Sequence, residues 1–126
     1  SAATAEAPIE CPPALSEKSI SVTSPNSSWR PYVPYAMKLT GAGFMAGAPE
    51  TLTELKPSFI KESKLRTVAQ WNFVGTYPDG KWLSCSYGGG TITLSKTIDV
   101  DTKSCEVTYA RAKIGSARLL EKISCR

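Results

Sequence analysis

The stretch "WLSCSYGGGTITLSK" (82–96) decides the fold class, because three consecutive glycines separate two segments in which apolar and polar residues alternate. Alternation with a period of two is typical of a half-buried strand, and glycine tolerates the positive φ that tight hairpin turns require. A phosphate-binding loop would need a helix directly after its glycines, whereas "TITLSK" is strand-like. The stretch therefore predicts a β-hairpin.

The register of this hairpin follows from matching its apolar sides. If Gly88 and Gly89 form a two-residue turn, Leu83 lies opposite Leu94 on one face of the sheet. A turn made of all three glycines would give a poorer match of apolar residues. We therefore expect the two-residue turn.

Three more segments alternate in the same way and extend the hairpin into a sheet. They are 67–73, 104–109 and 118–125, the last two joined by a turn centred on Gly115. Paired in chain order, the strands form an antiparallel meander whose inner face comprises Trp71, Phe73, Leu83, Cys85, Tyr87, Ile92, Leu94, Cys105, Val107, Tyr109 and Ile123. The predicted fold class is mainly β, a small disulfide-linked β or α+β domain with at most one or two short helices.

The N-terminal half is less regular. Residues 19–23 are expected to form a strand, and 24–34 a loop, because prolines exclude a central strand there. Residues 35–47 fit either a strand broken by glycines or an irregular hairpin. Residues 49–55 begin with a proline followed by an acid, which predicts a short helix.

Four cysteines, Cys11, Cys85, Cys105 and Cys125, indicate two disulfides, since an even count without metal-binding spacing is typical of oxidising compartments. In the meander Cys85 and Cys105 lie two strands apart, about 9.5 Å, whereas a disulfide needs Cα atoms within roughly 7 Å. The turn at Gly115 places Cys105 opposite Cys125. The register therefore favours Cys11–Cys85 and Cys105–Cys125, and the other two connectivities stay open.

The chain contains no histidine, which removes Ser-His-Asp and Cys-His systems, histidine-ligated zinc and the usual general base at neutral pH. Its acids stand mostly where turns and exposed strand positions are expected, so no catalytic carboxylate pair is indicated. The net charge of +4 comes from scattered Lys and Arg, unlike the basic cluster of a nucleic-acid binder, and no apolar run reaches the roughly 18 residues of a membrane span. We predict a non-enzyme with no cofactor or metal that binds neither nucleic acid nor membrane.

The start of the chain differs in composition from the rest. Residues 1–8, "SAATAEAP", are small and polar, as is typical after a signal-peptide cleavage site or in an expression remnant, and a disordered tail is expected there. Residues 9–126 contain no linker, repeat or low-complexity tract. They are expected to form a single domain.

Function is therefore expected to be binding, through loops that carry exposed apolar or small residues. In "LTGAGFMAGAP" (39–49), Phe44 and Met45 could anchor a partner or lie in the core. The segments 27–32 and 76–80 carry aromatic residues of the kind enriched at interfaces, or pack locally. The predicted partner-binding residues are Phe44, Met45, Gly43, Thr51, Tyr77, Asp79, Ser86 and Gly88.

Four motifs carry a family resemblance: "IECP" (9–12), "WLSCSYGGGT" (82–91), "CEVTYAR" (105–111) and "ISC" (123–125). Together they resemble small exported four-cysteine proteins of Gram-negative bacteria, and chains of this size and compartment are similar to immunity proteins of type VI secretion amidase effectors. The resemblance implies a periplasmic protein, exported through a cleaved signal peptide, that plugs the active-site cleft of a cognate peptidoglycan amidase and protects the producing cell. No catalytic residue carries over, and a homodimer is compatible with the sequence.

Other functions stay open at this point. A periplasmic lysozyme inhibitor is also a small disulfide-linked β protein, and "LSKT" (94–97) could present Ser and Lys to two catalytic carboxylates. A passive envelope protein would have no enzyme partner. A small-ligand carrier would need a roomy apolar cavity, whereas the predicted inner face is filled with aromatic side chains.

Overall fold

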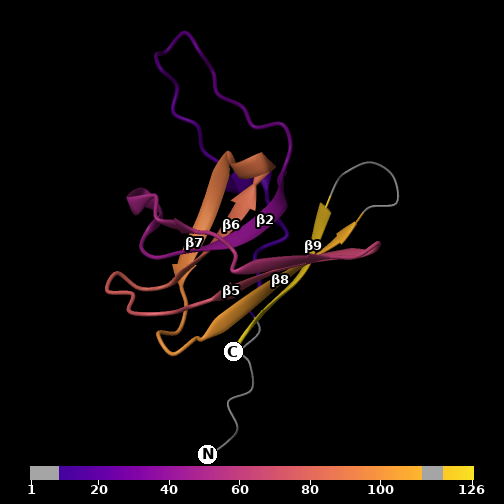
Figure 1. Ribbon diagram of the computed structural model, residues 1–126. Coiled ribbons are helices and arrows are strands. Elements are labelled where there is room, and N and C mark those ends of the chain that lie inside the picture. The colour runs from indigo at the N-terminus through magenta and orange to yellow at the C-terminus, as the bar shows by residue number, and fades with distance from the viewer. Residues whose placement is uncertain (1–8, 112–117) are drawn as a thin grey trace, which may run out of the picture.

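A computed structural model describes residues 9–111 and 118–126, and within these ranges the protein consists of two antiparallel sheets joined by loops (Figure 1). The predicted tail at 1–8 and the predicted turn at Gly115 lie outside the described residues. The helices of these ranges are short 3₁₀ turns, Glu17–Ser19 (η1), Pro49–Thr51 (η2) and Gly88–Gly90 (η3). None of them is long and apolar enough to cross a membrane. The prediction of a mainly β fold with two disulfides is confirmed.

The first sheet is built around β2 (Met37–Met45) and the glycine hairpin. β2 pairs with β6 (Trp82–Tyr87), which pairs with β7 (Ile92–Thr97). The other edge of β2 carries two short strands, β1 (Ala14–Leu15) at one end and β3 (Glu54–Leu55) at the other. The middle of that edge has no neighbouring strand among the described residues.

The second sheet has the strand order β4-β5-β8-β9. Its strands are β4 (Phe59–Glu62), β5 (Arg66–Asn72), β8 (Ser104–Arg111) and β9 (Arg118–Cys125). The predicted register of the last two strands is confirmed, since Cys105 pairs with Cys125 and Val107 with Ile123.

The single meander predicted from the sequence is wrong, because β5 and β6, which follow one another in the chain, lie in different sheets, as do β7 and β8. Trp71 on β5 pairs with Cys105 on β8 and not with Cys85 on β6. Two strands that the meander did not include, β2 and β4, pair with β6 and β5. In a two-layer fold every strand turns one face toward the core, so alternating apolar residues identify the inward side chains of each strand. They do not identify which strand pairs with which.

The glycine hairpin is present, with its register shifted by two residues. Leu94 pairs with Cys85 instead of Leu83. The turn is longer than predicted because all three glycines adopt positive φ (59°, 72° and 99°) and Thr91 donates its hydroxyl hydrogen to the carbonyl of Gly88 at 3.0 Å. A two-residue shift keeps side chains on their faces. Leu94 is nevertheless 40 % exposed, not buried as predicted, because β7 lies at the edge of its sheet.

Three predictions for the N-terminal half are settled by the structure. Residues 19–23 form no strand and lead into a loop that runs to residue 36. Residues 35–47 contain the continuous strand β2 with one bulge. Residues 49–55 are not one helix, because Leu52 adopts the left-handed conformation (φ 56°) directly after η2, and β3 follows.

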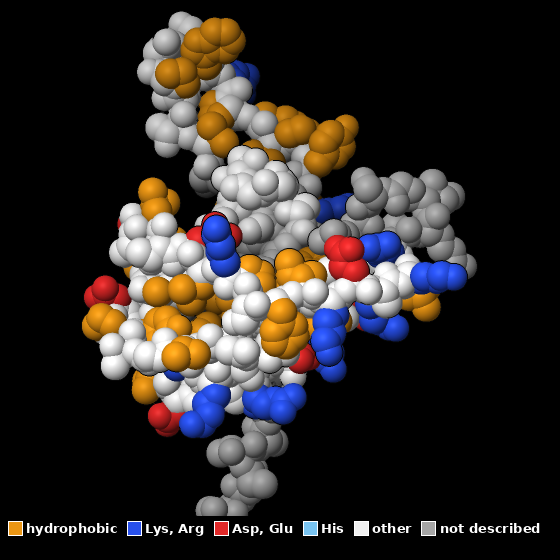
Figure 2. All heavy atoms as spheres, viewed as in Figure 1, with side chains coloured by type: hydrophobic (Ala, Val, Ile, Leu, Met, Phe, Trp, Pro, Cys, Tyr) orange, Lys and Arg blue, Asp and Glu red, His pale blue; other side chains and the backbone are white. Residues whose placement is uncertain are grey.

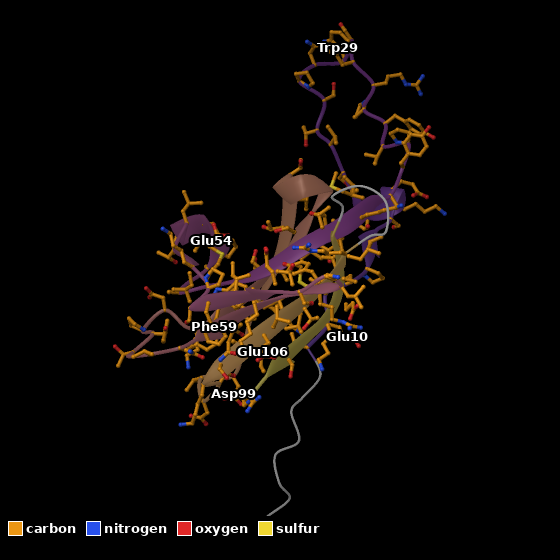
Figure 3. All side chains as sticks on the ribbon, turned by 45° about the vertical axis from the view of Figure 1, so that its right-hand side comes forward. Glu10, Trp29, Glu54, Phe59, Asp99 and Glu106 are labelled. Carbon is orange, nitrogen blue, oxygen red and sulfur yellow. A yellow bond between two sulfur atoms is a disulfide. The ribbon has the colours of Figure 1, made fainter. Side chains whose placement is uncertain are left out.

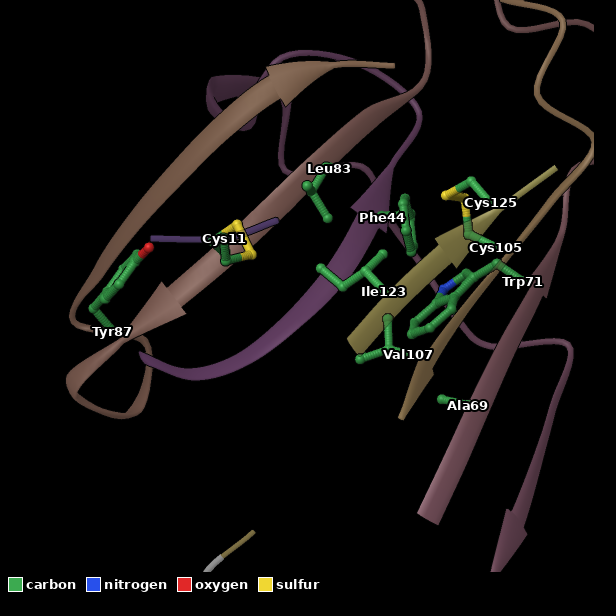
Figure 4. Close-up of a cluster of buried hydrophobic side chains, with 11 residues drawn as sticks. Cys11, Phe44, Ala69, Trp71, Leu83, Tyr87, Cys105, Val107, Ile123 and Cys125 are labelled. Atoms are coloured by element: carbon green, nitrogen blue, oxygen red, sulfur yellow. A yellow bond between two sulfur atoms is a disulfide. The ribbon is translucent and has the colours of Figure 1, made fainter. Parts of the chain in front are cut away.

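Apolar side chains from both sheets fill the space between them (Figure 4). Phe44 on β2 is fully buried and meets Trp71 and Phe73 edge to face, with ring centroids 5.0 and 5.6 Å apart. Such aromatic pairs contribute about 1 kcal/mol each beyond the area they bury. Of the predicted inner face, Trp71, Leu83, Cys85, Tyr87, Cys105, Val107 and Ile123 are buried, and Phe73, Ile92 and Tyr109 pack against them at partial burial.

The disulfides are Cys11–Cys85 and Cys105–Cys125, the pairs that the sequence favoured, with Cα atoms 5.8 and 4.0 Å apart. The first ties the segment before β1 to β6. Beside it, Tyr87 donates a hydrogen bond to the carbonyl of Pro12 at 2.7 Å, and burial raises the pKa of this tyrosine. The N-terminal segment is therefore held against the first sheet by a covalent bond and a part-buried hydrogen bond.

Tyr109 on β8 fills the gap that β1 and β3 leave on the edge of β2. Its hydroxyl accepts a hydrogen bond from the amide of Ala42 at 3.1 Å and donates one to the Ala42 carbonyl at 3.2 Å. Trp71 adds a second link between the sheets, from its indole N–H to the carbonyl of Leu55 at 3.0 Å. The two sheets are thus joined by polar bonds as well as by the apolar core.

Replacing Tyr109 with phenylalanine should lower the free energy of unfolding by about 2 kcal/mol, because both backbone groups of Ala42 lose their partner in a part-buried site. Urea denaturation of the purified variant measures this. Tyr35→Phe is the matched control, since Tyr35 is 80 % exposed and should change stability by less than about 0.5 kcal/mol. Equal effects of the two substitutions would contradict the role of Tyr109 between the sheets.

The two disulfides should contribute unequally to stability. Cys11–Cys85 spans 74 residues and Cys105–Cys125 spans 20. The chain-entropy model gives about 4 kcal/mol for the first and about 3 kcal/mol for the second. Paired alanine replacements, compared by urea denaturation, should therefore destabilise more at Cys11 and Cys85; the reverse order would contradict the expectation.

Candidate protein-binding surfaces

The two residues predicted as exposed anchors lie in the core. Phe44 is 0 % exposed and Met45 is 8 % exposed, so the expectation that they insert into a partner is wrong, and the alternative of a core position holds. The physical reason is the place of β2 inside the first sheet, with β6 on one side and β3 on the other at this end.

Thr51, from the predicted helix 49–55, and Asp79, from the predicted segment 76–80, both lie close to Gly47. A Cβ atom on Gly47 would lie 3.1 Å from the hydroxyl oxygen of Thr51 and 3.5 Å from the Cβ atom of Asp79. The Thr51 hydroxyl donates a hydrogen bond to a carbonyl of its own turn at 2.6 Å, so it stabilises η2. Tyr77 is half-buried, edge to face with Phe73 at 5.9 Å, which is local packing.

A groove of about 730 Å³ is lined by residues of both sheets, and two more predicted residues are among them. Gly43 on β2 and Ser86 on β6 line it. It is also lined by Leu52 and Ile60, whose side chains are 85 % and 56 % exposed. Gly88 does not line it, although the next two glycines of the turn do. The lining is mostly small or apolar, which suits contact with an apolar partner surface.

Leu52 is a functional candidate that sequence reasoning missed. Among the described residues it is the one non-glycine with a positive φ, 56°. The left-handed conformation costs a residue such as leucine about 1–2 kcal/mol, and its exposed side chain recovers little of that by packing. Strained residues of this kind cluster at ligand-contact sites, so the groove beside Leu52 is a candidate contact surface.

A second surface is the long connection between β1 and β2, which extends away from both sheets (Figure 1). We call residues 20–36 the projecting loop. Its exposed large residues are Val22, Trp29, Tyr32 and Tyr35, at 55, 66, 84 and 80 %. Figure 2 shows hydrophobic side chains gathered on this extension, and Figure 3 places Trp29 at its outer end. The sequence offered 27–32 only as one of several aromatic segments.

The Asp, Glu and Cys side chains of the described residues form no metal site. No group of three or more His, Cys, Asp or Glu in these ranges could hold a metal ion. The described cysteines are all in disulfides. The candidate contact surfaces are therefore the groove and the projecting loop.

The structure is that of a small disulfide-linked β protein whose exposed aromatic side chains are of the kind enriched at protein interfaces. The chain matches the family model of the Type VI secretion system Tli immunity protein over residues 33–126, three quarters of its length, and belongs to that family. No curated protein and no solved structure matches it in the comparisons. The matched segment contains every strand from β2 to β9, whereas most of the projecting loop precedes it.

The glycine turn offers a test of whether Gly88 has a structural role. Gly88 and Gly89 both have positive φ, so alanine at either should cost about 1 kcal/mol in backbone strain. A Cβ atom on Gly88 would also lie 2.8 Å from the sulfur of Met37, whereas one on Gly89 has nothing within 4 Å. Gly88→Ala should therefore destabilise by about 1 kcal/mol more than Gly89→Ala in urea denaturation. Equal losses would refute the steric role of Gly88.

Proposed function

We propose that this type VI secretion immunity protein neutralises a cognate effector by binding it and covering its active site, without catalysing a reaction itself. The observation that carries the proposal is the family match over residues 33–126. We propose further that the effector is a peptidoglycan amidase, because chains of this size and proposed compartment resemble immunity proteins of that effector class.

The fold supports inhibition by steric contact. Two disulfides and an aromatic core hold the strands in place, and a preorganised surface loses little conformational entropy on docking. The groove and the projecting loop then present apolar side chains to a partner. Of the predicted contact residues, Gly43 and Ser86 in the groove and Thr51 and Asp79 around Gly47 stay candidates for the interface.

The proposed compartment is the periplasm. Disulfides form and persist in oxidising compartments, among them the bacterial periplasm, and both disulfides here lie in the core. An immunity protein in that compartment would meet its effector where peptidoglycan is exposed. Osmotic-shock fractionation of cells that express the gene with its own leader should recover the protein in the periplasmic fraction.

The proposal is tested with the purified protein and the effector encoded beside its gene. Titration of the protein against release of peptides from purified peptidoglycan should bring the activity to zero at a one-to-one ratio. A complex that forms while the effector leaves peptidoglycan intact would overturn the amidase class alone. Absence of a complex would overturn the proposed function, and inhibition of lysozyme in a parallel assay would favour the lysozyme-inhibitor alternative.

A further inference from the structure

We propose that the projecting loop, residues 20–36, is the element that enters the effector and decides which effector is recognised; this rests on the proposed function. The partner surface that fits it is a concavity of the effector lined by apolar side chains and carboxylates.

The loop combines the residue types that dominate protein interfaces energetically. Trp, Tyr and Arg are the residues most enriched among interface hot spots. Trp29, Arg30, Tyr32 and Tyr35 all lie in this one loop, and its aromatic side chains are the most exposed aromatic ones of the described residues. Large apolar side chains held this far out of the core bury their area only against another molecule.

The outer end of the loop is ordered by its own hydrogen bonds. The Ser24 hydroxyl contacts the carbonyl of Asn26 and donates to the carbonyl of Trp29 at 2.8 Å. The amide of Ser28 donates to the Asn26 side chain at 2.8 Å. Three prolines, Pro25, Pro31 and Pro34, fix φ along the loop. A loop arranged in this way loses little entropy on binding.

The base of the loop is closed from both sides. β1 pairs with the start of β2, Ala14 with Lys38 and Leu15 with Met37, and the Cys11–Cys85 disulfide lies just before β1. Residues 16–36 are therefore a long excursion between two paired strands. Loops of more than about 15 residues in a compact fold are usually functional or disordered, and the hydrogen bonds of this one favour function.

The charge of the projecting loop indicates what kind of partner surface would attract it. No Asp or Glu occurs between residues 18 and 49, whereas Lys18, Arg30 and Lys38 are cationic. Within residues 20–36 the one charged residue is Arg30, and Glu17 and Lys18 lie side by side at the base of the loop. The outer part of the loop is therefore positive, and a cavity that carries carboxylates would attract it. A cavity with a positive potential would repel it.

The segment matched by the family model covers the strands β2 to β9 but not most of the projecting loop. The matched segment begins at Val33, so Trp29, Arg30 and Tyr32 precede it, while β2 to β9 lie inside it. Proteins that share a framework and bind different partners differ in the contacts that discriminate between those partners, and a segment outside the shared part can supply them. The exposed tip of the projecting loop is such a place.

The first experiment measures affinity of the full protein for its cognate effector by calorimetry. Trp29→Ala and Tyr32→Ala should each weaken binding at least 30-fold. Leu65→Ala is the matched control, because Leu65 is 69 % exposed on a turn of the second sheet, and it should change affinity less than twofold. Unchanged melting temperatures establish that the variants fold. If Trp29→Ala and Tyr32→Ala bind the effector as tightly as the wild-type protein does, this inference is overturned and the proposed function stands. If the wild-type protein does not bind the effector, both are overturned.

Two further variants test charge and recognition. Arg30→Glu should slow association about tenfold at low salt, with a smaller difference at high salt. Exchange of residues 16–36 with the same segment of a family member that has a different effector should transfer the effector preference. Preference that stays with the framework would overturn the recognition part of the inference.

Discussion

The contact of Phe44 with Trp71 and Phe73 is the interaction on which the structure depends. Phe44 belongs to the first sheet, and the other two rings belong to the second sheet or directly follow its strand β5. Neither sheet can bury an apolar face alone, because the apolar face of an open sheet is covered only by another packed layer. Burial of a side chain of this size contributes about 2–3 kcal/mol, and it does so only when the sheets are stacked.

Aromatic side chains also make the polar bonds between the layers. Tyr109 completes the edge of β2, and the Trp71 indole reaches β3, so both hydrogen bonds form only when the sheets are in register. Apolar stacking is non-directional, whereas these bonds specify one relative position. The Cys11–Cys85 disulfide then fixes the N-terminal segment to the first sheet, which closes the base of the projecting loop.

The sequence predicted the inward residues well and the strand neighbours poorly. Alternation identified Leu83, Val107 and Ile123 as core positions because burial imposes that period directly. It could not place β6 beside β2, since pairing depends on which edges are open in three dimensions. The exposed Trp29 loop and the strained Leu52 were not distinguished either, because exposure and backbone strain are properties of the folded chain.

The residues that stabilise the fold and the residues that we propose contact the effector are separate in this architecture. Substitutions in the core remove packing that both sheets share, whereas the exposed side chains of the projecting loop bury little area in the free protein. Surface substitutions of that kind usually change stability by less than about 0.5 kcal/mol. The loop sequence can therefore change without unfolding the framework, provided that its base stays closed by the β1–β2 pairing and the Cys11–Cys85 disulfide. An immunity protein that must follow changes in its effector has use for such a separation.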